Sequence, residues 1–207
     1  MLRCFARTSS FFALMLASAF ALAQVEFSAD IVNNTKAGSP VQARAYFSKD
    51  KMRFDAQEKG ARDKGAVIIN FATHSYLVVM AEQHMYMEMP AQTMDQRGMY
   101  SFFQTGDVEN ACSDWLKLSR NVGGTCHKVG NESVNGRSAI KYEGTNSSGE
   151  SSQVWLDPKL RFPVKWQEKN GGGELRNIQE GPQPASLFEI PAGFTKMDLG
   201  GMMQQRH

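Results

Sequence analysis

The sequence lacks most of what an enzyme or a metalloprotein needs. Its three Cys and four His do not have the paired spacing that metal and catalytic sites use. It contains no Gly-x-Ser-x-Gly motif and no phosphate-binding glycine loop. No candidate nucleophile has a candidate base beside it in a recognisable pattern. The sequence therefore predicts a protein that is not an enzyme and that needs no cofactor and no metal.

An excess of positive charge is also missing. The chain has 23 Lys and Arg against 21 Asp and Glu, and Arg3 and Arg7 lie within the first 23 residues. Without that segment each sign counts 21 residues, so the chain is formally neutral. Nucleic-acid binding needs excess Lys and Arg, and attachment to a membrane surface needs a basic patch. No later apolar run approaches the roughly 18 residues of a membrane span.

The first 23 residues are typical of a secretory signal peptide. Arg3 and Arg7 make the start positive, and an apolar stretch over 11–22 follows. The small residues of Ala21-Leu22-Ala23 then match a cleavage site. We therefore predict a cleavable signal peptide over residues 1–23 and an exported protein.

Only two cysteines, Cys112 and Cys126, remain after this segment, because Cys4 lies within it. An even pair in an exported protein most simply forms a disulfide. The alternative is a redox pair or a metal site, but catalytic dithiols usually have C-x-x-C spacing. We predict a structural disulfide between Cys112 and Cys126.

Two groups of β-strands are predicted by alternating or continuous apolar residues. The Asn135-Gly136 pair is the strongest hairpin signal in the chain. No change of composition separates the two groups, so we predict a single β-domain over residues 24–198 and a flexible tail at 199–207. The predicted strands are 25–31, 41–47, 52–55, 66–71, 76–80 and 85–89, then 132–134, 137–143, 154–156, 162–166 and 174–179, after which residues 187–191 close the ordered part.

Between the two groups the spacing of apolar residues becomes helical. An amphipathic helix is predicted from Asp107 to Gly123 by residues that recur at steps of three and four. These residues are Val108, Ala111, Cys112, Trp115, Leu118 and Val122. A weaker stripe predicts a shorter helix over 91–104, with Met94, Met99, Phe102 and Phe103 on one side. The predicted disulfide would tie this helical segment to the next strand.

Several short phrases occur in an order that resembles a known family. Together they are similar to the bacterial outer-membrane lipoprotein carrier superfamily, and most closely to a periplasmic branch of it. The resemblance spans nearly all of residues 24–198. The phrases are Phe27-Ser28-Ala29-Asp30, Lys51-Met52-Arg53-Phe54, Met85-Tyr86-Met87-Glu88-Met89-Pro90, Val134-Asn135-Gly136-Arg137, Lys141-Tyr142-Glu143, Val154-Trp155-Leu156-Asp157, Phe162-Pro163-Val164-Lys165 and Leu187-Phe188-Glu189-Ile190-Pro191-Ala192-Gly193-Phe194.

The resemblance implies a mainly β (α+β) fold: a strongly curved antiparallel sheet, forming an unclosed barrel, covered by helical lid segments. It also implies a periplasmic location and a hydrophobic ligand, such as a lipid or a lipoprotein acyl chain, held between the sheet and the lid. Methionine suits such a cavity because its side chain is flexible and polarizable, although the same residues could simply fill a core. The candidate cavity-lining residues are Met85, Met87, Met89, Met94, Met99, Phe102, Phe103 and Trp115.

Two other functions stay open at this point. The curved sheet could dock or sense an envelope protein without transporting a ligand. Met85, Met87 and Met89 could bind Cu(I), which prefers thioether ligands, although His84 would point to the opposite face of a regular strand. The expected partner is therefore a hydrophobic small molecule or lipid, with an envelope protein as the alternative.

Overall fold

A computed structural model describes residues 25–35, 41–56, 65–90, 107–117 and 121–197. These residues form one sheet of twelve strands, which is not closed into a barrel. The first group is β1 (Phe27–Thr35), β2 (Val41–Phe47), β3 (Lys51–Ala56), β4 (Gly65–Asn70), β5 (Ser75–Met80) and β6 (Met85–Pro90). The second group is β7 (Thr125–Val134), β8 (Arg137–Thr145), β9 (Ser151–Asp157), β10 (Phe162–Glu168), β11 (Gly171–Glu180) and the short β12 (Thr195–Lys196).

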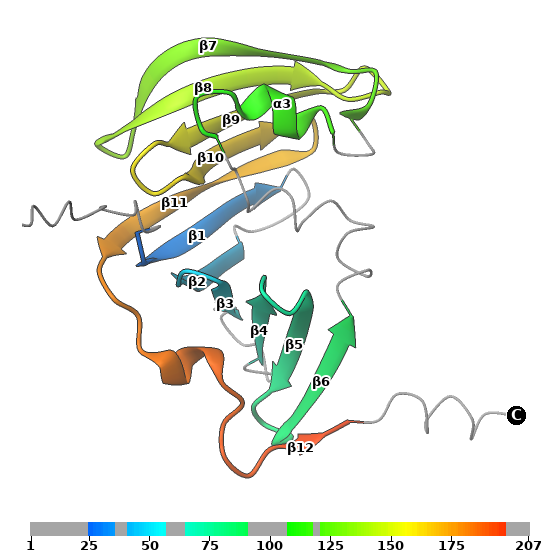
Figure 1. Cartoon of the computed structure of the whole chain (residues 1–207), viewed down its shortest axis with the longest axis vertical. Coiled ribbons are helices and arrows are strands. Elements are labelled where there is room, and N and C mark those ends of the chain that lie inside the picture. The colour runs from blue at the N-terminus through cyan, green and yellow to red at the C-terminus, as the bar shows by residue number, and fades with distance from the viewer. Residues whose placement is uncertain (1–24, 36–40, 57–64, 91–106, 118–120, 198–207) are drawn as a thin grey trace, which may run out of the picture.

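The sheet consists of two antiparallel meanders joined side by side. The strand order is β12-β6-β5-β4-β3-β2-β1-β11-β10-β9-β8-β7, so β1 and β11 form the seam. Only β12 runs parallel to its neighbour, β6. Figure 1 shows the strand direction turning strongly from β7–β11 to β4–β6. The mainly β, antiparallel prediction is confirmed.

Local turn chemistry explains the predicted hairpin between β7 and β8. Asn135 has φ 50° and Gly136 has φ 79°, as a two-residue turn of the primed type requires. Asn tolerates a positive φ better than most residues with a side chain, and Gly adopts it freely. The sequence signal at Asn135-Gly136 is therefore confirmed.

The curvature of the sheet is shown by three phenylalanines. The strands β2 and β10 are separated by β1 and β11, which would place them about 14 Å apart in a flat sheet. Yet the ring centroids of Phe47 and Phe162 are 4.5 Å apart, and those of Phe27 and Phe162 are 5.7 Å apart. The sheet must curl around these rings, so we call the face that carries them the concave face. The strongly curved, unclosed sheet is confirmed.

The main core lies on this concave face. Phe27 and Phe47 also stack on each other, with centroids 4.1 Å apart. Leu160, in the turn between β9 and β10, is fully buried in the same cluster. The buried members of the core are Phe27, Ala29, Ile31, Ala45, Phe47, Met52, Ile69, Val134, Ala139, Trp155, Leu160, Phe162, Val164 and Leu175.

The predicted helical lid is not supported. In the described part of the segment between β6 and β7, the α-helix α3 covers only Ala111–Trp115. The helix predicted over 107–123 is therefore much too long. Asn121 explains an early end, because its side-chain amide donates a hydrogen bond of 2.9 Å to the carbonyl of Trp115. The predicted helix over 91–104 lies outside the described residues.

Helix α3 packs on the second meander, away from the main core. Ala111 joins Ile140, Tyr142 and Leu156 in a separate buried cluster, and Figure 1 shows α3 beside β8 and β9. The Tyr142 hydroxyl donates a hydrogen bond of 2.8 Å to the Val108 carbonyl. The helix thus covers β8 and β9, and no α-helix of the described residues covers β4–β6.

The C-terminal segment covers the other side of the first meander. After β11 it forms a 3₁₀ helix, Ala185–Phe188, and reaches β12 beside β6 (Figure 1). Leu187, Phe188 and Phe194 pack on the face of β2, β4 and β5 opposite the main core, which we call the outer face. Arg53 fixes the segment with a hydrogen bond of 2.8 Å to the Leu187 carbonyl.

The two ends of the chain lie outside the described residues, which include neither the predicted signal peptide nor the predicted tail. Within the described ranges, no helix has the length and apolar character needed to cross a membrane.

Candidate functional site

The methionines of β6 lie on the concave face, at the end of the sheet farthest from β7. Antiparallel partners point to the same side of a sheet, and so do alternate residues of one strand. The β5–β6 register pairs Tyr76 with Met89, Val78 with Met87, and Met80 with Met85. The β3–β4–β5 register then continues this row inward, from Tyr76 to Ile69 and from Ile69 to Met52.

We call the outermost part of this concave surface the methionine face. It consists of apolar side chains of three neighbouring strands, all half-buried. Its members are Val67, Val78, Met80, Met85, Met87 and Met89. The sequence analysis named three of these six residues, Met85, Met87 and Met89, as candidates. It missed Val67, Val78 and Met80, because the continuous apolar runs of β4 and β5 do not indicate which residues face which side.

Burial falls along the concave face from the core to the methionine face. Met52 and Ile69 are only 2% and 1% exposed, whereas every residue of the methionine face retains part of its surface in solvent. The same apolar surface thus begins in a packed core and ends in an accessible region. Such a surface can bury further apolar groups without disturbing the core.

One sulfur on the methionine face has a polar partner. The Tyr76 hydroxyl donates a hydrogen bond of 3.0 Å to Sδ of Met89. This contact orients Met89 and places a hydroxyl group at the border of the apolar surface. The surface is otherwise built from groups that cannot form strong hydrogen bonds, so it favours apolar ligands.

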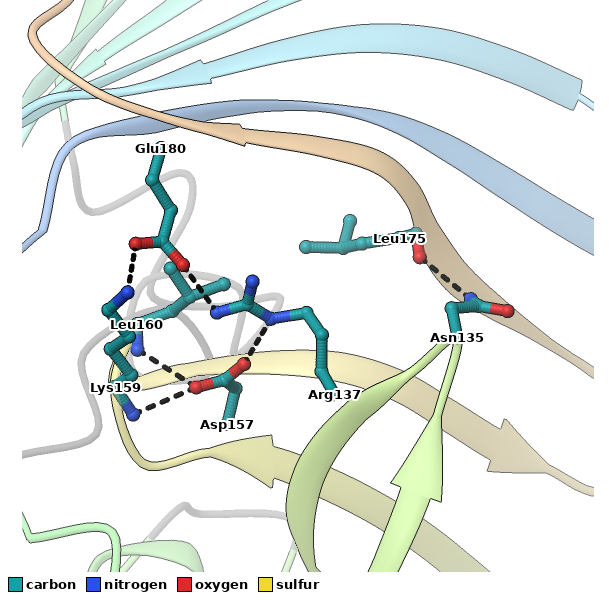
Figure 2. A network of polar contacts seen from close by, with 7 residues as sticks. All are labelled: Asn135, Arg137, Asp157, Lys159, Leu160, Leu175 and Glu180. Atoms are coloured by element: carbon teal, nitrogen blue, oxygen red, sulfur yellow. Dashed lines mark hydrogen bonds and ion pairs between the residues drawn. The ribbon is translucent and has the colours of Figure 1, made fainter.

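The opposite end of the concave face is closed by a polar network, shown in Figure 2. Asp157 is buried and accepts hydrogen bonds from the backbone N–H groups of Lys159 (2.8 Å) and Leu160 (3.0 Å). Arg137 lies between Asp157 and Glu180 and donates to both carboxylates. The network joins β8, the β9–β10 turn and the end of β11, and thereby holds Leu160 inside the core.

The electrostatics of this network favour its charged form. Hydrogen bonds from Lys159 and Arg137 hold the pKa of Glu180 below its usual value. Burial disfavours the charged guanidinium of Arg137, but its hydrogen bonds to Asp157 and Glu180 outweigh that effect and raise its pKa. The network is thus a fixed set of ion pairs, and all of its charges have partners.

A second link ties the β7–β8 hairpin to the seam of the sheet. The side-chain amide of Asn135 donates a hydrogen bond of 3.0 Å to the carbonyl of Leu175 in β11, as Figure 2 shows. The hairpin tip therefore reaches across β9 and β10. This end of the sheet is closed by both polar and apolar contacts.

The structure separates Trp115 from the methionines with which it was grouped. Its ring lies against Gly144 of β8, so closely that a Cβ atom on Gly144 would be 2.9 Å from a ring carbon. Strands β8 and β6 lie near opposite ends of the strand order. Met94, Met99, Phe102 and Phe103 lie outside the described residues, so their predicted role stays a prediction.

The predicted disulfide is confirmed. Cys112 of α3 and Cys126 of β7 are bonded, with their Cα atoms 5.4 Å apart. Both residues also pack against the apolar cluster beneath α3. The bond therefore fixes α3 to β7, the edge strand of the second meander. The sequence analysis predicted this link between the helical segment and the next strand.

Metal binding by the methionines stays a prediction. Within the described ranges, no three His, Cys, Asp or Glu residues lie together in a way that could hold a metal ion. His84 lies in the exposed turn before β6, with its ring 5.4 Å from that of Phe194. Among the described residues, the thioethers of the methionine face are the candidate ligands, and thioethers suit Cu(I).

No family model matches the sequence, and no curated protein does. Solved structures do match. An uncharacterised conserved protein from Thermus thermophilus has a TM-score of 0.55 at 10% identity, over 85% of this chain and 91% of that one. MucB of Pseudomonas aeruginosa, in its complex with MucA, has a TM-score of 0.52 at 14% identity, over 84% of this chain.

The shared feature is the fold. MucB has a LolA-like fold, so the predicted resemblance is confirmed at the level of the fold. This chain spans 58% of the MucB chain. A LolA superfamily protein from Nitrosomonas europaea also matches, with a TM-score of 0.34 at 10% identity over 82% of this chain and 91% of that one.

Proposed function

We propose that this protein binds a hydrophobic ligand, a lipid or a lipoprotein acyl chain, on the methionine face, as a periplasmic binding or carrier protein without catalytic activity. The observation that carries the proposal is the fall in burial along one continuous apolar surface. Met52 and Ile69 are packed in the core, whereas Met85, Met87 and Met89 on the same concave face are only half-buried.

The physical basis is removal of apolar area from water, worth roughly 25 cal/mol per Å² before ordering costs. Unbranched methionine side chains can adjust to ligands of irregular shape. The core behind them is held by Phe27, Phe47 and Phe162, so binding needs no rearrangement there. A rigid core beside an adaptable surface limits the entropy lost on binding.

A second candidate is docking of an envelope protein on the same face. The observation that favours it is the fold likeness to MucB, which has been solved in complex with MucA. A partner segment with apolar side chains would bury the same residues. The two candidates differ in what the purified protein carries.

The first experiment is native mass spectrometry of the protein purified from bacterial periplasm without detergent, followed by organic extraction. A stoichiometric lipid or acylated peptide, recovered chemically unchanged after incubation, is the expected result. An empty protein that also fails to take up a fluorescent long-chain fatty acid would overturn the ligand proposal. Co-purification of a defined protein partner would then support the docking function. Recovery in the cytoplasmic fraction would contradict the periplasmic location.

A charge substitution tests the location of the site. Met87→Glu places a carboxylate on the methionine face, where burying it beneath an apolar ligand is costly. We expect fatty-acid affinity to fall about tenfold or more, since that corresponds to about 1.4 kcal/mol. Ala81→Glu adds the same charge to the exposed turn of the same hairpin and should leave affinity unchanged. Equal affinity in the two variants would place the ligand elsewhere.

A further inference from the structure

A second concavity lies on the outer face, between the first meander and the C-terminal segment. It is a pocket of about 280 Å³. Its floor is formed by Ile68, Leu77 and Tyr86 of β4, β5 and β6, and Phe188 and Ile190 of the C-terminal segment form its other wall. By the alternation of strand residues, Ile68 and Leu77 point away from the methionine face, so this pocket is separate from the proposed ligand site.

One end of this outer pocket is rich in hydrogen-bond donors. The register places Lys51 opposite Asn70, and Asn70 opposite Ser75, one row beyond the apolar floor. Thr73 completes this end, where its hydroxyl lies 2.8 Å from that of Ser75. The apolar and polar rows are adjacent, so the pocket is amphipathic.

The donor atoms at this end have spare capacity. Oδ1 of Asn70 already accepts hydrogen bonds from the N–H groups of Ala72 (3.0 Å) and Thr73 (3.1 Å), which leaves its NH₂ group as a donor. Within the part of the chain that the structure describes, the Lys51 ammonium has no carboxylate in ion-pair range. The end of the pocket therefore offers one cation and several neutral donors.

The acidic residue of the lining is already neutralised. Glu88 also lines the pocket, and its carboxylate forms an ion pair of 2.5 Å with Lys196 of β12. It therefore leaves the Lys51 end available for an anion. The pocket therefore has a positive end at Lys51, an apolar middle, and on the side of β6 the Glu88–Lys196 ion pair, which has no net charge.

We propose that this outer pocket binds a small amphipathic carboxylate, with its anionic group at Lys51 and Asn70 and its apolar chain between Leu77 and Phe188. The charge-assisted hydrogen bonds at the donor end select a carboxylate over a neutral head group. The apolar walls select a hydrocarbon body over a polar one.

The volume sets the length of the ligand. At roughly 30 Å³ for each water-sized group, the pocket holds about nine such groups. A medium-chain fatty acid anion such as octanoate has this size, whereas a phospholipid does not. The outer pocket would thus take a different class of ligand from the methionine face.

The test is isothermal titration of the whole protein with octanoate, n-octanol and acetate. We expect saturable octanoate binding, about tenfold weaker binding of the neutral alcohol, and no detectable binding of acetate. Lys51→Met keeps the aliphatic stem and should weaken octanoate binding about tenfold. Lys49→Met changes an exposed lysine of the neighbouring turn and should have no effect. No octanoate binding, or equal binding by the two variants, would overturn the proposal.

Methyl NMR distinguishes this pocket from the methionine face. Octanoate should shift the methyl signals of Ile68, Leu77 and Ile190 and leave those of Met85 and Met87 unchanged. Shifts confined to the methionine signals would refute the outer pocket while supporting the proposed function. Failure of the methionine face to bind lipid, with Ile68 and Leu77 still responding to octanoate, would leave this inference intact.

Discussion

The two ends of the concave face have similar side chains but different surroundings. At the closed end, Phe47 and Phe162 from distant strands pack together, and Arg137 and Asp157 fix the neighbouring turn. At the open end, Met87 has the same orientation toward the concave side but is only half-buried. The two ends differ in which chain segments the curvature of the sheet packs against them.

This comparison separates stability from binding. Residues that are covered by their own chain stabilise the fold, and an apolar region that the described chain leaves partly open is available for a ligand. Shortening a side chain should therefore lower the free energy of unfolding strongly at the closed end and only slightly at the open end. The following measurements test that difference, from the largest expected effect to the smallest.

Replacing one large side chain by alanine at each end should give the largest difference in the free energy of unfolding. Phe162→Ala should lower the free energy of unfolding by about 3–5 kcal/mol, because it leaves a cavity beside Phe27 and Phe47. Met87→Ala should cost only about 1 kcal/mol, since its side chain is only half-buried. Urea unfolding at constant m-value measures both. Similar losses would show that the methionine face is part of the core.

The buried network should contribute more than a surface ion pair. Asp157→Ala should cost about 3 kcal/mol, because it removes the partner of Arg137 and the acceptor for two backbone N–H groups. Asp114→Ala breaks the exposed pair with Lys117 and should cost less than about 1 kcal/mol. Thermal unfolding of the two variants provides the comparison. A similar loss in both would mean that the network does not hold the closed end.

Reduction of the disulfide should affect stability and leave ligand binding unchanged. The bridge between Cys112 and Cys126 spans a sequence separation of 14 residues, for which chain entropy predicts about 3 kcal/mol. Because α3 packs on Ile140 and Tyr142, fatty-acid affinity at the methionine face should not change. Unfolding and binding measured with and without reductant test this. A large loss of affinity on reduction would imply that α3 reaches the ligand.

The smallest effect on stability is expected from lowering the pH. Since the pKa of Glu180 is lowered in the folded protein, its contribution is complete above its ordinary value of 4.5 and is lost as pH falls through the folded value. Glu180→Gln should flatten the decline of stability below that pH, whereas Glu189→Gln, an exposed change, should not. Stability of the variants measured across acidic pH decides this, and parallel curves would exclude a role for Glu180.

The sequence predicted the strands well where one face is buried, and less well at the edges. The strand β7 begins at Thr125, well before the predicted start at residue 132. As an edge strand with mostly exposed residues and an irregular register near Gly130, it lacks the alternation that reveals a half-buried strand. The pairing of β12 with β6 was also missed, because two residues carry no pattern.

The helix prediction failed for a different reason. Apolar residues at helical spacing between 108 and 122 describe a segment that packs on one side, but spacing alone does not establish a continuous helix. Two specific contacts constrain this segment: the bridge to Cys126 and the local hydrogen bond from the Asn121 side chain to the Trp115 carbonyl. Neither can be read from periodicity.

What the sequence by itself determined is the local structure: the alternating strands, the Asn135-Gly136 turn, the cysteine pair and the shared face of Met85, Met87 and Met89. These follow from backbone geometry over a few residues. The tertiary structure alone decided which apolar residues are core and which form an accessible surface. That depends on the curvature of the sheet, which brings Phe162 onto Phe47 and leaves Met87 only half-buried, because burial is a property of distant chain segments packed together.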